Sequence, residues 1–314
     1  MEDNTWIDYL TINENDYGVS NNLEIEHYYN INTESDTYLQ SAIDTWSLIY
    51  KTGTKFIELE FGNIFQVDVY DRYYLIYVPN ECIVGEKYPV VIFLHGLSQS
   101  AWHNALKRTG LIELANEKHF IVLFGQGQGE ISCPTRDKYG GISFGDIYWN
   151  IKNPEIDIDY INQIINLQGE ICDSQKEINL SNIHSMFDME KIFLWGYSNG
   201  AMCAFNMAMS IIRIKFAGIC SMMGGYAGLA GYPSKIMESI IDKFDNNLST
   251  NVPVIIITGS LDEYNPASQE AVKMLRDKNF TKVELIIIDG QKHSYPKNYE
   301  QRVWKFFVQN LSNF

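Results

Sequence analysis

Residues 192–202 read Ile-Phe-Leu-Trp-Gly-Tyr-Ser-Asn-Gly-Ala-Met, and they hold the clearest sign of how this chain folds. The first four are apolar and predict a strand buried on both faces, as in parallel sheets. The next five match G-x-S-x-G, in which a sharp turn joins a strand to a helix and holds the serine in strained geometry. Ala201–Ile212 then has helical spacing. The alternative interpretation is an ordinary strand-to-helix turn with a capping serine.

Similar short apolar runs lie on both sides of this segment and alternate with segments of helical spacing. This order is typical of an α/β fold with a mostly parallel central sheet covered by helices on both faces. Besides Ile192–Trp195, the predicted strands are Val90–Leu94, Phe120–Phe124, Phe216–Cys220, Val254–Ile257 and Val283–Ile288. The predicted helices are Ile156–Leu167, Ala201–Ile212, Ala267–Arg276 and about 299–311. Alternating apolar residues between Phe65 and Pro79 predict a hairpin at the sheet edge.

Residues 1–60 differ in composition from the rest and are rich in Asn, Asp, Glu, Thr and Tyr. We interpret them as an N-terminal appendage packed on a main domain of residues 61–314. Within the appendage, apolar residues from Leu39 to Tyr50 fall at helical spacing, with Ser35 and Asp36 as candidate caps.

The overall composition suits a protein with a large core. The chain has 314 residues, 46% of them apolar and 20% charged, and a formal net charge of −15. Such an acidic chain is repelled by nucleic-acid phosphates and by anionic membranes. No apolar stretch approaches the roughly 18 residues that span a bilayer. We therefore expect neither a nucleic-acid partner nor a membrane span.

The spacing of the cysteines indicates whether the chain binds a metal or forms disulfides, and its first residues indicate its cellular location. The five cysteines are widely spaced, without a C-x-x-C pair or a Cys/His run of zinc spacing. The sequence thus predicts no metal, no cofactor and no disulfide framework. Residues 1–4, Met-Glu-Asp-Asn, show no signal-peptide pattern. We expect a cytoplasmic protein, with secretion after loss of a leader as the alternative.

A serine nucleophile at Ser198 needs a base and an acid, which follow it in the chain in the order acid, then histidine. His293 comes after the predicted strand Val283–Ile288 and is the one histidine beyond Ser198. Asp262 follows the preceding strand and is the favoured acid, whose role is to hold the histidine in the right tautomer. Glu263 is its nearest rival, and Asp289 is a third candidate.

The turn after Val90–Leu94 is the candidate oxyanion segment. It reads His95-Gly-Leu-Ser98, and the backbone N–H groups of Leu97 and Asn199 are the predicted donors. We expect His95 to shape this turn by hydrogen bonds rather than act as a base.

Other polar and aromatic residues complete the candidate site. Residues near it that could contact a substrate are Tyr197, Gln126, Trp149 and Tyr295. Asp157 and Asp159 lie two apart at the start of a predicted helix, where capping and the helix dipole explain them better than metal or acid–base chemistry.

Taken in order, these segments resemble the α/β-hydrolase esterases of the polyhydroxybutyrate depolymerase and feruloyl esterase group. The similarity runs over about residues 66–314, and the nucleophile segment 196–202 is its most specific part. The other segments that carry it are 72–79, 89–96, 99–101, 157–161, 252–259 with Asp262, and 293–296. The chain departs from the group at 124–129, a glycine-rich turn, and at Gly169–Met189, which looks like an insertion.

The resemblance implies an α/β-hydrolase fold and a catalytic triad of Ser198, Asp262 and His293. It implies a serine esterase that forms an acyl-enzyme from a small-molecule or polymeric ester, without a cofactor. Two alternatives stay open: an acyltransferase or peptidase on the same triad, and a non-catalytic binding protein on a hydrolase scaffold. The sequence favours no oligomeric state.

Overall fold

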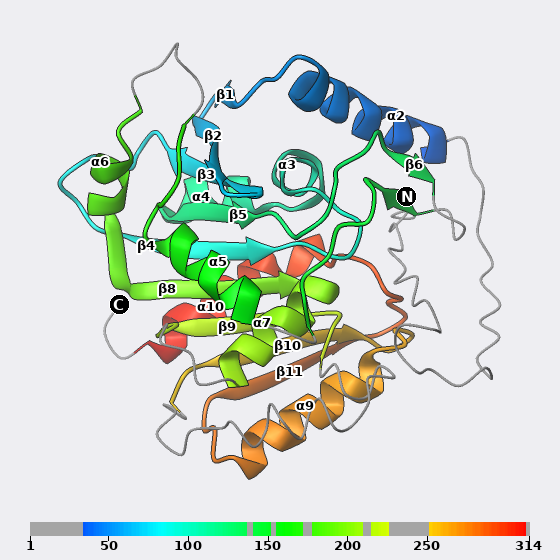
Figure 1. Ribbon diagram of the computed structural model, residues 1–314. Coiled ribbons are helices and arrows are strands. Elements are labelled where there is room, and N and C mark those ends of the chain that lie inside the picture. Colours follow the sequence, from blue (N-terminus) through cyan, green and yellow to red (C-terminus); the bar gives the residue numbers. More distant parts are fainter. Residues whose placement is uncertain are drawn as a thin grey trace.

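A nine-stranded sheet forms the centre of the molecule (Figure 1), with the strand order β1-β2-β3-β5-β4-β8-β9-β10-β11. The structure is a computed structural model that describes residues 34–136, 141–151, 155–171, 178–209, 215–225 and 251–311. The pairs β1-β2, β2-β3 and β3-β5 are antiparallel, and the remaining pairs are parallel. The predicted mostly parallel sheet with an antiparallel edge is therefore confirmed.

Each predicted strand is observed, although β8 begins five residues earlier than predicted and β9 begins two residues later. The strands of the large sheet are β1 (Phe56–Leu59), β2 (Gly62–Val69), β3 (Arg72–Pro79), β4 (Tyr88–Leu94), β5 (Ile121–Gly125), β8 (Phe187–Tyr197), β9 (Gly218–Met222), β10 (Val254–Gly259) and β11 (Val283–Ile288). A separate short hairpin consists of β6 (Thr135–Arg136) and β7 (Ile142–Ser143).

Helices cover both faces of the sheet, as predicted. The helices are α2 (Glu34–Trp46), α3 (Ala101–His103), α4 (Leu111–Lys118), α5 (Glu155–Ile165), α6 (Leu180–Ser185), α7 (Asn199–Met209), α9 (Asn265–Asp277) and α10 (Glu300–Asn310). Because side chains alternate along a strand, Val90 and Ile92 of β4 join one core with α5, α7 and α9, while Val91 and Phe93 join a second core with α3, α4 and α10.

Residues 34–60, the described part of the predicted appendage, contact the rest of the chain through α2 and β1, and the division into an appendage and a main domain stays a prediction. The predicted helix is observed as α2, which continues into a π-helical turn over Ser47–Lys51. β1 pairs with β2 in the large sheet, although it lies before the predicted boundary at residue 60. Residues 1–33, and the side chains of the candidate caps Ser35 and Asp36, lie outside what the structure describes.

Asp157, in the first turn of α5, forms a buried ion pair with Arg72. Its carboxylate Oδ1 lies 2.7 Å from Nη1 of Arg72, and both side chains are buried. The other oxygen accepts a hydrogen bond from the backbone N–H of Asn150 at 2.5 Å. The Arg72 guanidinium lies 4.3 Å above the centre of the Tyr160 ring. Asp157 therefore lies in the first turn of α5, where the helix-dipole interpretation places it, and it also joins α5 to β3 through a buried ion pair.

Removal of the cation from this pair should destabilise the fold. We expect Arg72→Met to lower the free energy of unfolding by about 3–5 kcal/mol, because it leaves Asp157 as an uncompensated buried charge. Denaturant titration measures this effect. Arg302→Met is the matched control, since Arg302 forms an exposed ion pair with Glu284 and exposed pairs contribute little. Equal losses in the two variants would contradict the prediction.

The structure also describes parts of the chain on which three other predictions bear: the insertion, the absence of a disulfide framework and the absence of a membrane span. The predicted insertion Gly169–Met189 contains α6 and the first residues of β8, while 172–177 lie outside the described residues. The described cysteines, Cys82, Cys133, Cys203 and Cys220, are free thiols. Among the described residues, no helix combines the length and apolar character needed to cross a bilayer.

Candidate active site

Ser198 lies at the sharp turn between β8 and α7, as predicted from the G-x-S-x-G pattern. Its φ of +52° is in the left-handed region, which a non-glycine residue adopts only under strain. A side chain at Gly196 would overlap the backbone of Gly200, and one at Gly200 would overlap the carbonyl of Leu94. The two glycines thus allow α7 to start directly against the end of β4, with the serine at the tip of the turn.

His293 lies in the turn after β11, and its imidazole connects Ser198 to Asp262. Nε2 of His293 lies 2.9 Å from Oγ of Ser198, and Nδ1 lies 3.0 Å from Oδ1 of Asp262. All three side chains are buried. Residues separated by 95 and 31 positions in the chain therefore form one continuous hydrogen-bonded array at the carboxyl ends of three parallel strands.

The structure distinguishes among the three candidate acids. Asp262 is fixed by a hydrogen bond from the backbone N–H of Tyr264 to Oδ1 at 3.0 Å, and that oxygen faces His293. Glu263 is exposed at the same turn. Asp289 instead accepts a hydrogen bond from the Ser260 hydroxyl at 3.4 Å. The geometry thus favours Asp262 as the partner of the histidine.

The same corner holds the one group of metal-ligand type among the described residues. One ligand atom from each of Asp262, Glu263 and His293 lies within 4.8 Å of the others. His293 Nδ1 already faces Asp262 and Nε2 already faces Ser198. The prediction that the protein uses no metal stays a prediction.

The electrostatic environment raises the pKa of His293. Burial alone lowers this pKa, but the negative charge of Asp262, its hydrogen bond and the nearby Glu263 outweigh burial, so the pKa lies above its ordinary value of 6.5. Arg108 opposes this rise. Its guanidinium carbon lies 5.0 Å from the centre of the Tyr197 ring, and the centre of the His293 ring lies 5.8 Å from that of Tyr197. The position of Arg108 beside the site could not be predicted, because nothing in the segment Lys107-Arg108 distinguishes it from an ordinary helix end.

The candidate oxyanion turn, residues 95–98, begins beside the turn that holds Ser198, because a side chain at Gly200 would overlap the His95 carbonyl. His95 shapes it as expected: Nδ1 lies 2.7 Å from the Gly96 carbonyl, and Nε2 accepts a hydrogen bond from the Gly127 N–H at 2.9 Å. Burial lowers the pKa of His95 to about 4, so its imidazole is neutral. The Asn199 N–H is at the first position of α7, where the helix offers it no acceptor. The role of the Leu97 and Asn199 N–H groups stays a prediction.

The four candidate substrate-binding residues are buried, and their polar atoms contact other protein groups. Tyr197 stacks on His293, and the Tyr295 hydroxyl donates to Glu300 at 2.6 Å. Gln126 Oε1 accepts from the Ala101 N–H at 2.8 Å, and Trp149 Nε1 donates to the His95 carbonyl at 2.8 Å. Direct contact of these residues with a substrate stays a prediction.

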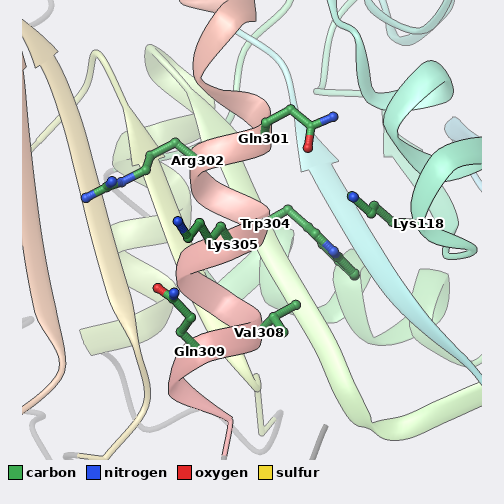
Figure 2. A pocket seen from close by; sticks show the side chains of 7 residues that line it. All are labelled: Lys118, Gln301, Arg302, Trp304, Lys305, Val308 and Gln309. Atoms are coloured by element: carbon green, nitrogen blue, oxygen red, sulfur yellow. The ribbon is translucent and has the colours of Figure 1, made fainter.

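A surface pocket elsewhere on the molecule is separate from this array. Figure 2 shows it along α10, with one residue contributed by α4. Its lining residues are Lys118, Gln301, Arg302, Trp304, Lys305, Val308 and Gln309. None of the candidate catalytic residues lines it.

This chain is similar to known proteins in sequence and in structure. An uncharacterized hydrolase of Acanthamoeba polyphaga mimivirus is 50% identical over 315 residues, which span 99% of each chain. An acetyl xylan esterase from Aspergillus awamori has a similar structure, with a TM-score of 0.58 and 16% identity over 78% of this chain and 98% of the esterase. An S-formylglutathione hydrolase from Agrobacterium tumefaciens gives a TM-score of 0.55 and 14% identity over 82% of this chain and 98% of the other.

At these low identities, the two solved structures support the fold alone. The family assignment rests on the sequence, because residues 81–311 match the model of the phospholipase/carboxylesterase family. This match spans more than half of the chain and includes each residue of the Ser198, His293 and Asp262 array. The chain therefore belongs to the phospholipase/carboxylesterase family of α/β-hydrolases.

Proposed function

We propose that this protein is a serine esterase that cleaves a carboxylic ester through Ser198, His293 and Asp262. One observation carries the proposal: the serine, the histidine and the aspartate form a continuous array, with distances of 2.9 and 3.0 Å between the bonded atoms. A nucleophile bonded to a base, and a base oriented by a third group, is the arrangement that activates a serine hydroxyl.

The chemistry follows from this arrangement in two halves. Ser198 Oγ attacks the ester carbonyl while Nε2 of His293 takes its proton, and the carbonyl π electrons move onto the oxygen. The N–H groups of Leu97 and Asn199 stabilise this oxyanion. When the carbon–oxygen double bond reforms, the alkoxide leaves with the proton from His293 and an acyl-serine remains. His293 then takes a proton from a water as that water attacks the acyl carbon. It returns the proton to Oγ of Ser198 as the bond between the acyl carbon and Oγ breaks, which releases the acid and free Ser198.

The substrate class and the acceptor are the finer parts of the proposal. The sequence resemblance favours an esterase similar to polyhydroxybutyrate depolymerases and feruloyl esterases, acting on a small-molecule or polymeric ester. The same array would serve an acyltransferase or a peptidase, because the pocket rather than the triad selects the acceptor. Product analysis after incubation with ester in water, with and without added alcohol, distinguishes hydrolysis from acyl transfer.

Labelling with a fluorophosphonate tests the activated serine directly. We expect stoichiometric labelling of the wild type, located at Ser198 by peptide mapping, and no labelling of Ser198→Ala. A folded wild type that stays unlabelled and hydrolyses neither short acyl nor aryl esters would overturn the proposal and favour a binding protein on a hydrolase scaffold.

The kcat/KM for ester hydrolysis should fall at acidic pH, with a midpoint above the ordinary histidine pKa of 6.5. His293 accepts a proton from Ser198 only when it is neutral, so kcat/KM decreases as the pH drops through the pKa of His293. Since that pKa is raised above 6.5, the midpoint of the acid limb should lie above 6.5. Rates measured between about pH 5 and pH 9 check this. A midpoint at or below 6.5 would show that burial outweighs the carboxylates.

A further inference from the structure

We infer that α2, the helix before the main domain, is a brace that holds the oxyanion turn and the Asn199 N–H in position for catalysis. The inference deepens the proposed esterase function and rests on it. α2 (Glu34–Trp46) lies outside the segment that matches the family, which begins at residue 81. Figure 1 shows α2 at the upper edge of the molecule, on the side where β6 lies.

The first link in the brace is an apolar contact between α2 and the loop that includes β7. Ala42 of α2, together with Ile142, Phe144 and Ile147 of the loop, forms a small core of its own, separate from the two cores of the sheet. Ala42 and Ile147 are fully buried. Tyr38, Leu39 and Trp46 of α2 pack around this core. One face of α2 therefore supports residues 142–147.

The second link joins this loop to the oxyanion turn. The N–H of Ser98 donates to the Ile147 carbonyl at 2.7 Å, and the N–H of Phe144 donates to the Ser98 carbonyl at 2.8 Å. Ser98 has a φ of +58°, a conformation that persists in a non-glycine residue only where the surroundings enforce it. The two hydrogen bonds from the supported loop supply that constraint, directly beside Leu97.

The third link reaches the other predicted oxyanion donor. The backbone N–H of Trp149 donates to Oδ1 of Asn199 at 2.6 Å, and Nδ2 of Asn199 lies 3.4 Å from the Trp149 carbonyl. Nε1 of Trp149 also donates to the His95 carbonyl at 2.8 Å. The loop on which α2 packs thus contacts both segments whose N–H groups would hold the oxyanion.

A parallel polar contact ties α2 to the helix that follows the oxyanion turn. The Tyr38 hydroxyl lies 2.8 Å from Nε2 of His103, the last residue of α3. The His103 ring packs against Phe144, with 5.1 Å between the ring centres. Burial lowers the pKa of His103 to about 4, so its imidazole is neutral. α2 therefore supports the turn from both sides, through the loop and through α3.

A brace of this kind predicts a specific kinetic effect. Oxyanion donors act on the transition state, so their displacement lowers kcat and weakens transition-state analogues while KM stays nearly constant. Displacement by about 1 Å from a distant substitution can cost about 100-fold in rate. General loss of folded protein would instead leave the analogue affinity of the remaining folded enzyme unchanged.

The test uses the full chain and two variants on the packed face of α2. Ala42→Leu overfills the small core and pushes α2 from the loop, and Tyr38→Phe removes the hydroxyl near His103. Gln40→Leu is the matched control, since Gln40 is exposed on the same helix. For each protein we would measure kcat and KM with a p-nitrophenyl ester, the Ki of a trifluoromethyl ketone, and the rate of fluorophosphonate labelling.

We expect Ala42→Leu to lower kcat by about 10- to 100-fold, with KM within about twofold and with the Ki raised by the same factor as kcat falls. Tyr38→Phe should likewise lower kcat and raise the Ki, each by about threefold or more. If kcat and the Ki of both variants lay within about twofold of those of Gln40→Leu, the inference would be overturned. If Ala42→Leu does not fold, Tyr38→Phe decides.

The two failures are distinguishable. A wild type that reacts with the fluorophosphonate, combined with variants that match the control, would overturn the brace and leave the serine esterase intact. A wild type that neither reacts nor hydrolyses esters would overturn the proposed function and the brace together.

Discussion

Ser198→Ala should lower kcat for ester hydrolysis by about 10⁴- to 10⁶-fold, the loss seen when a triad nucleophile is removed. In the proposed mechanism this hydroxyl forms the acyl-enzyme, and Nε2 of His293 lies 2.9 Å from it. Alanine removes only the oxygen, so the strained turn and the neighbouring Asn199 N–H remain. The residual rate then measures what binding and the oxyanion donors contribute on their own.

A second buried serine provides the control for this substitution. Ser221 in β9 is fully buried, and its hydroxyl lies 3.4 Å from the Ala201 carbonyl of α7. Ser221→Ala removes an oxygen near the same helix without touching His293, so its kcat should stay close to that of the wild type. A loss of less than about tenfold for Ser198→Ala would contradict the nucleophile assignment, because a triad serine cannot be dispensable.

Local sequence patterns were sufficient to predict most of the fold. Continuous apolar runs such as Val90–Leu94 correspond to strands with a core on both faces, and the structure places β4 between β5 and β8 with both faces covered. The turns after β8, β10 and β11 were predicted to hold Ser198, Asp262 and His293, and they meet in space. The proximity of these turns could be predicted because the carboxyl ends of parallel strands lie at one edge of a sheet.

Contacts between distant side chains could not be predicted in this way. The pair of Arg72 and Asp157 spans 85 positions, and Tyr38 and His103 are 65 positions apart. No periodic pattern encodes such partners, because they depend on how elements pack after the sheet has formed. The candidate substrate contacts illustrate the same limit: Gln126 and Trp149 were selected for their position near the site, and their polar atoms contact Ala101 and His95.

Asp262→Asn should lower kcat by about 10⁴-fold, even though the side chain keeps its size. The carboxylate accepts a hydrogen bond from Nδ1–H of His293, which leaves Nε2 free to take the proton of Ser198. An amide that donates to Nδ1 would place the ring proton on Nε2, and that tautomer cannot act as the base. The substitution also removes the charge that most raises the pKa of His293. The acid limb of the pH–rate profile should therefore move to lower pH.

The two other candidate acids serve as controls of the same chemistry. Glu263→Gln removes an exposed charge that also raises the pKa of His293, so it should shift the acid limb slightly downward with kcat nearly retained. Asp289→Asn, whose carboxylate contacts Ser260, should change neither. If Glu263→Gln lost as much activity as Asp262→Asn, the orienting acid would be shared between them. The loss of tautomer control and the loss of charge are thus separable, because only Asp262 both contacts Nδ1 and carries the nearest negative charge.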